Sequence, residues 1–143
     1  MIDPRTAPYG LFLLRVSLGV MFIAHAALKV FVFTVPGFAG FLAQVGLPSF
    51  MALPVIAAEI VGGLALVLGV YSRLVGVLLL PVLLGALMVH SGNGWLFTAA
   101  NGGWEYPAFL VLATVTLILG GDGAFALRPT PTSFAPRLAA QTA

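Results

Sequence analysis

Four long runs of apolar residues decide what this chain can fold into. They lie at about 9–35, 51–70, 73–90 and 105–120. An α-helix needs roughly 20 apolar residues to cross a hydrocarbon core about 30 Å thick. The runs are continuous and do not alternate, which is typical of helices and excludes the strands of a membrane barrel. We therefore expect an all-α polytopic membrane protein, a four-helix bundle in one domain over residues 1–127.

The composition excludes the main soluble alternatives. Hydrophobic residues make up 61% of the 143 residues and charged residues 7%, whereas a soluble domain has about a quarter charged residues. Such a chain lacks the polar surface of a soluble enzyme, a disordered protein or a nucleic-acid-binding protein. It contains no cysteine, which excludes disulfides, thiol redox chemistry and thiolate metal sites.

The positions of arginine predict how the bundle is oriented. All loop arginines fall on one side of the predicted membrane: Arg5, Arg73, Arg128 and Arg137. The other two loops, at 36–53 and 91–104, contain neither lysine nor arginine. Because positive loops stay in the cytoplasm, we expect both termini to be cytoplasmic. Arg73 and Arg128 are therefore assigned a topological role.

Two segments outside the spans have a distinct composition. The first outer loop contains PGFAGFLAQVGLPSF, which is mostly apolar and bracketed by prolines, so we expect a short interfacial helix there. Residues 128–143 are rich in proline, threonine and alanine. We expect them to form a disordered cytoplasmic tail.

Five ionisable residues from four predicted helices fall in the outer half of the bundle: His25, Lys29, Glu59, His90 and Glu105. A charge at the centre of a membrane helix costs about 2.5–3.5 kcal/mol, so each should face the interior and find a partner. His25 and Lys29 share a helix face through their i, i+4 spacing. We expect Lys29 to pair with Glu59, and His90 with Glu105. Arg15, assigned a structural role, should snorkel back to the cytoplasmic interface.

Several stretches resemble the DoxX family of small four-helix bacterial membrane proteins. The resemblance covers about residues 10–127 and rests on LLRVSLGVMFIAHAALK, FAGFLAQVGLP, AAEIVGGLALVLGVYSRLVG and NGGWEYPAFLVLATVTLILGGDGAFAL. The chain departs from the family pattern at Ala26, where relatives often have glycine. It also lacks the family's Ser-Leu-Asp ending at GDGAFALRPT. The family's recurring polar positions correspond here to Arg15, His25, Lys29, Glu59, Arg73, His90 and Glu105.

The resemblance implies a protein of the bacterial inner membrane that is linked to redox enzymes. Some relatives are subunits of thiosulfate:quinone oxidoreductase, and others associate with superoxide dismutase and a sulfurtransferase. We therefore expect an accessory subunit or anchor of an oxidoreductase or oxidative-stress system, with a redox enzyme as its partner. In this interpretation a quinone binds in the outer half of the bundle, where His25 and Lys29 contact its carbonyls and Glu59 relays protons. His90 and Glu105 are further candidates for ligand binding or proton relay.

Other functions stay open at this point. The chain could be a purely structural scaffold for a partner enzyme, in which buried charges only fix helix packing, or a transport protein for small solutes or protons. Haem is disfavoured because His25 lies about 15 Å below the level of His90, and no metal site is expected. The sequence has no nucleophile constellation, phosphate loop or dinucleotide fingerprint, so we expect no catalysis by this chain alone. We expect the lipid bilayer as a partner and no nucleic acid, and a homo-oligomer stays open.

Overall fold

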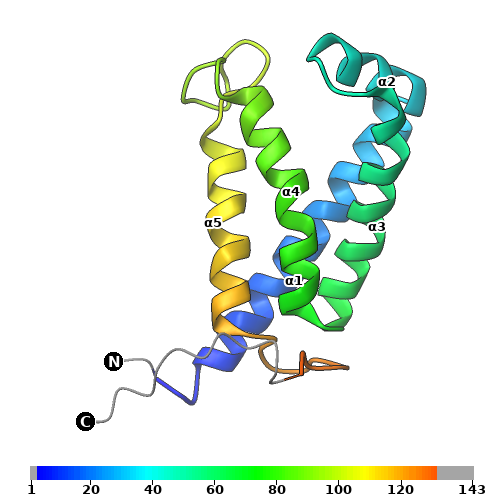
Figure 1. The fold of residues 1–143 in the computed structure, drawn as a ribbon. Helices are drawn as coiled ribbons and strands as arrows, with labels where there is room; N and C mark the ends of the chain where they lie inside the picture. Colours follow the sequence, from blue (N-terminus) through cyan, green and yellow to red (C-terminus); the bar gives the residue numbers. More distant parts are fainter. Residues whose placement is uncertain (1–2, 132–143) are drawn as a thin grey trace.

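The computed structural model describes residues 3–131 and shows a bundle of helices (Figure 1). The α-helices of these residues are α1 (Ala7–Ala27), α2 (Val35–Gln44), α3 (Ala52–Leu68), α4 (Ser72–His90) and α5 (Glu105–Gly120). A π-helical turn, Leu28–Val32, extends α1, and a 3-10 turn, Ser49–Met51, leads into α3. The described part of the chain contains no strand beyond one isolated bridge between Val70 and Arg128. The predicted all-α class is confirmed.

Three helical segments are long and apolar enough to cross a membrane, judged by length and composition: Ala7–Val32, Ser49–Leu68 and Ser72–His90. The fourth predicted span is helical over the predicted residues, 105–120. With 16 residues and a rise of 1.5 Å per residue, α5 is about 24 Å long, which is shorter than the hydrocarbon core. Its role as a fourth span therefore stays a prediction.

The helices associate mainly as two pairs, α1 with α3 and α4 with α5 (Figure 1). In the first pair α1 crosses α3 so closely that a Cβ atom added to Gly19 would lie 2.6 Å from the carbonyl oxygen of Gly63. Small residues permit such approach, and close packing is what holds membrane helices together. In the second pair α4 lies along α5, with Gly76 against Ile118. Helices α3 and α4 leave the turn that joins them and then diverge.

Two apolar clusters form the core. The larger joins both helix pairs and contains Leu18, Phe22, Leu66, Leu79, Leu83, Leu110, Ala113 and Leu117. The smaller attaches α2 to the ends of α1 and α3 through Ala26, Phe38, Leu42, Ala52 and Ile56. The predicted loop helix therefore exists as α2, and it docks on the bundle by one face. Its location at a membrane interface stays a prediction.

Arg15 does not snorkel to an interface, so that expectation was wrong. Its side chain is fully buried, and it donates hydrogen bonds to the carbonyl oxygens of Leu66 (2.9 Å), Val67 (3.3 Å) and Ala124 (3.1 Å). The last carbonyls of a helix have no partner within the helix and carry partial negative charge, so a cation at the end of α3 is stabilising. Gly69, with a φ of 72°, makes room, because a Cβ there would overlap the Arg15 guanidinium.

Asp122 forms a second group of polar contacts at the end of the bundle where Arg15 lies. Its carboxylate accepts hydrogen bonds from Ser72 N (2.7 Å), Thr130 N (2.9 Å) and Thr130 Oγ1 (2.8 Å). Burial alone would raise the pKa of Asp122, but the hydrogen bonds from Thr130 and Ser72 outweigh burial and hold the pKa below its usual value. The carboxylate also lies at the positive N-terminus of α4. This single side chain therefore ties the start of α4 to the segment that follows α5.

The structure describes the first residues of the predicted tail 128–143, up to residue 131. The backbone of Arg128 bonds to Gly69 and Tyr71, and the Arg73 backbone donates to Thr130 Oγ1. Arg73 and Arg128 thus lie at one end, together with the start of α1, which bonds through Pro8 to Ala124. Arg137 and the rest of the predicted tail, 132–143, lie outside the described residues.

Candidate functional site

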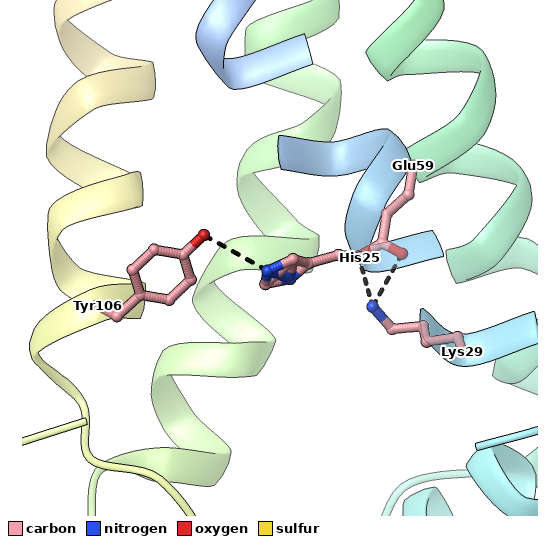
Figure 2. Close-up of polar contacts among 4 residues, drawn as sticks. All are labelled: His25, Lys29, Glu59 and Tyr106. Carbon is pink, nitrogen blue, oxygen red and sulfur yellow. Dashed lines mark hydrogen bonds and ion pairs between the residues drawn. The ribbon is translucent and has the colours of Figure 1, made fainter. Parts of the chain in front are cut away.

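Lys29 and Glu59 form a bidentate ion pair between the π-helical turn and α3 (Figure 2). Lys29 Nζ lies 2.7 Å and 2.8 Å from the two carboxylate oxygens of Glu59, and the side chains are only 15% and 5% exposed. The ammonium also lies 5.3 Å from the centre of the Phe38 ring on α2, a cation–π contact. The predicted pair is confirmed. Because an ammonium has three donors, this set of partners leaves Lys29 little capacity to bind a ligand.

His25 and Tyr106 face each other between the two helix pairs (Figure 2). The Tyr106 hydroxyl lies 3.4 Å from His25 Nε2, within hydrogen-bond reach, and the ring centroids are 5.7 Å apart. His25 comes from α1 and Tyr106 from the first turn of α5. Both residues are partly exposed. A hydroxyl and a neutral imidazole can each donate or accept a hydrogen bond, so together they can hold a carbonyl or hydroxyl group.

His90 and Glu105 do not form the expected pair. His90 Nδ1 contacts the carbonyl oxygen of Ala86 at 2.8 Å, one turn back on α4. Glu105 instead accepts a hydrogen bond from the backbone of Phe97 at 2.8 Å. Each side chain satisfies the backbone at a helix end or in the loop, where orphan polar groups are common. Glu105 therefore organises the 91–104 loop, His90 bonds within α4, and neither joins the other polar residues.

The five predicted site residues thus separate into three groups with different chemistry. Lys29 and Glu59 neutralise each other, His25 has a hydroxyl partner, and His90 and Glu105 bond to backbone. Within residues 3–131 no three side chains of histidine, aspartate or glutamate come together in a way that could hold a metal ion. The pair His25 and Tyr106 is accordingly the arrangement in this region with free capacity for a ligand.

Tyr106 is the site residue that sequence reasoning missed. Tyr106 lies two positions after Trp104, and two aromatic residues so placed are typical of the aromatic belt at a membrane interface. One signal for another role was present, because Tyr106 begins an inward helix at the outer level where His25 was placed. A hydroxyl at that depth is a natural partner for an imidazole from another helix.

Comparison with known proteins gives a consistent family assignment. The family model described as DoxX matches residues 10–92. A protein of Bacillus subtilis named "Putative oxidoreductase CatD" is 35% identical over 120 residues, which cover 84% of this chain and 85% of that protein. A protein of Haemophilus influenzae described as "Uncharacterized protein" is 32% identical over 122 residues, covering 84% of this chain and 89% of its own length. No solved structure matches the chain.

Proposed function

The chain belongs to the DoxX family, and from that premise we propose that it is an accessory membrane subunit of an oxidoreductase system, with a quinone-type ligand bound at His25 and Tyr106. The observation that carries this proposal is the contact between His25 and Tyr106, two partly exposed polar side chains from different helix pairs. The relative named as an oxidoreductase supports the redox link. In this proposal the bundle lies in the bacterial inner membrane with α5 as its fourth span and both termini in the cytoplasm.

The donor set fits the head group of a quinone. A quinone carbonyl accepts hydrogen bonds, and the Tyr106 hydroxyl and the His25 imidazole can both donate them. A bound quinone would supply the electron-transfer chemistry, since the chain has no cysteine for thiol redox chemistry. The protein's own contribution is to orient the ring and to hold a proton at His25 Nε2 or at the Tyr106 hydroxyl.

The ion pair has a supporting role in this proposal. Lys29 follows His25 by one helical turn, and its bonds to Glu59 fix the end of α1 against α3. The Lys29 ammonium also contacts Phe38 and so links α2 to the same group. We therefore assign Lys29 and Glu59 to positioning His25, and no longer to contacting the quinone carbonyls or relaying protons.

Ligand retention tests the proposal directly. Protein would be extracted with its surrounding lipid and analysed by native mass spectrometry for a bound quinone. We expect wild type to retain one and His25→Ala to lose it. Tyr106→Phe removes one hydrogen bond, worth about 0.5–1.5 kcal/mol, and should weaken affinity about 2- to 13-fold. Tyr9→Phe, at an exposed tyrosine near the start of α1, is the matched control. A wild type that neither carries nor binds quinone would overturn the proposal.

One observation favours a second candidate, a scaffold for a partner enzyme without a ligand of its own. Lys29 and Glu59 are fully committed to each other, as expected of charges that specify packing. If a redox enzyme copurifies equally well with wild type and with a His25→Ala, Tyr106→Phe double variant, and no quinone is found in either, the scaffold function is favoured.

A further inference from the structure

The His25–Tyr106 pair lies in a bundle whose two ends are built differently. One end, here called the terminal end, contains residues 3–6, the α3–α4 turn and residues 121–131. The other, here called the far end, contains α2 and the 91–104 loop (Figure 1). We infer that water and ligands reach His25 and Tyr106 from the far end alone, and that the bundle is sealed toward the terminal end. This inference rests on the proposed function and adds the side on which the site exchanges ligand and protons.

Between α1 and α5, side chains that lie nearer the terminal end than the His25–Tyr106 contact are less exposed. His25 and Tyr106 are partly exposed. One turn deeper on α1, Phe22 is 4% exposed, and the next layer contains Leu79 at 2% and Leu117 at 0%. These side chains belong to one continuous apolar cluster drawn from α1, α3, α4 and α5. Because protein interiors are packed nearly as densely as organic crystals, such a layer leaves no path for water.

Below this layer the terminal end is closed by polar contacts between segments distant in sequence. Arg15, fully buried, joins α1 to the end of α3 and to Ala124. Asp122 joins the start of α4 to Thr130. These bonds hold residues 121–130 across the end of the bundle, where the backbone of Arg128 also pairs with the α3–α4 turn. Opening this end would break several charge-assisted hydrogen bonds, which are stronger than bonds between neutral groups.

At the far end the smaller apolar cluster covers the ends of α1 and α3, but it includes no residue of α5 or of the 91–104 loop beside Tyr106. The segment that leads to Tyr106 is the 91–104 loop, most of whose residues are exposed. Glu105, adjacent to Tyr106, is partly exposed and bonds to the loop backbone. His25 and Tyr106 contact each other but stay partly exposed, and contact with water or a polar ligand stabilises their exposed polar atoms more than contact with hydrocarbon does. The site is therefore blind-ended, and the chain is not a conduit through which a solute or proton crosses from one end to the other.

Single-cysteine labelling tests this inference, because the natural chain contains no cysteine. His25→Cys would be treated with a membrane-impermeant maleimide, applied to right-side-out and to inverted membrane vesicles. Thr98→Cys in the exposed far-end loop and Thr6→Cys, exposed before α1, report which side each vesicle presents. Thr114→Cys, at a fully buried position on α5, is the reference for sealed positions. Tyr106→Cys repeats the test from the opposite helix pair in case His25→Cys does not fold.

We expect His25→Cys and Tyr106→Cys to react only in vesicles in which Thr98→Cys reacts, and Thr114→Cys to react in neither. Reaction from the side that labels Thr6→Cys, or from both sides, would overturn the inference. So would a failure of both site cysteines to react from either side in protein that retains its native thermal unfolding profile. The labelling needs no quinone, so sidedness and ligand binding can fail independently.

Discussion

Replacing Lys29 by methionine should destabilise the bundle by about 3–4 kcal/mol, whereas replacing Lys29 and Glu59 together should cost less than about 1 kcal/mol. The paired charges are 2.7 Å apart, and their attraction at an effective dielectric constant of about 20 is about 6 kcal/mol. Desolvation of the two ions consumes most of that attraction. A lone Glu59 would have to bind a proton, which at pH 7 costs at most about 3.7 kcal/mol for a carboxyl group with an ordinary pKa.

Reversible unfolding in mixed micelles, with increasing sodium dodecyl sulfate, measures these differences. The set is wild type, Lys29→Met, Glu59→Leu and the double variant, which together give the coupling free energy. In folded Lys29→Met the Glu59 carboxyl binds a proton that the unfolded chain does not bind. The loss of unfolding free energy relative to wild type should therefore shrink by about 1.4 kcal/mol for each unit that the pH falls from 7 toward 5. The reasoning is refuted if the double variant loses the sum of the two single losses, or if the Lys29→Met deficit does not change with pH.

Three further predictions concern the rest of the bundle. Arg15→Met should cost about 1–3 kcal/mol in the same unfolding assay, because the carbonyls of Val67 and Ala124 lose the donor Arg15. A loss below about 1 kcal/mol would contradict the contacts. Asp122→Asn should cost about 1–2 kcal/mol at pH 7. Because the folded pKa of Asp122 is depressed, its contribution should persist above the ordinary pKa and disappear as the pH falls through the folded value; an Asn variant with an unchanged acid-unfolding profile would argue against this. Gly19→Ala should destabilise through its clash with Gly63, whereas Gly10→Ala, in open space on the same helix, should not; equal melting temperatures would contradict the close helix crossing.

The helices and one ion pair could be predicted from the sequence for a simple reason. A long continuous apolar run satisfies its backbone polar groups in a bilayer only as a helix. The ends of the predicted runs and of the observed helices accordingly agree to within a few residues. Lys29 and Glu59 were the two opposite charges placed at similar depth in neighbouring helices, and a buried charge needs a partner. Both results follow from the high cost of polar groups in hydrocarbon.

The partners of Arg15, His90 and Glu105 could not be predicted from the sequence, because they are backbone groups whose positions depend on the fold. Arg15 lies about one turn from a predicted interface, and only the structure shows that the open carbonyls of α3 and Ala124 lie within its reach. His90 and Glu105 also bond to backbone. Tyr106 was overlooked for a related reason, since its partner belongs to a helix 81 positions away. Depth can be estimated from the sequence, whereas the neighbours at a given depth depend on how the helix pairs are arranged.

The pairing of α1 with α3 has a consequence for how the protein is made. The ion pair, the smaller apolar cluster and the first two acceptors of Arg15 all lie within residues 7–68. Chains emerge from the ribosome N-terminus first, and early segments associate before later ones exist. The first three helices can thus pair Lys29 with Glu59 and bind Arg15 through two carbonyls while α4 and α5 are still being synthesised. The segment that follows α5 then brings Asp122 and the carbonyl of Ala124 into contact with Ser72 and Arg15, which have already been synthesised.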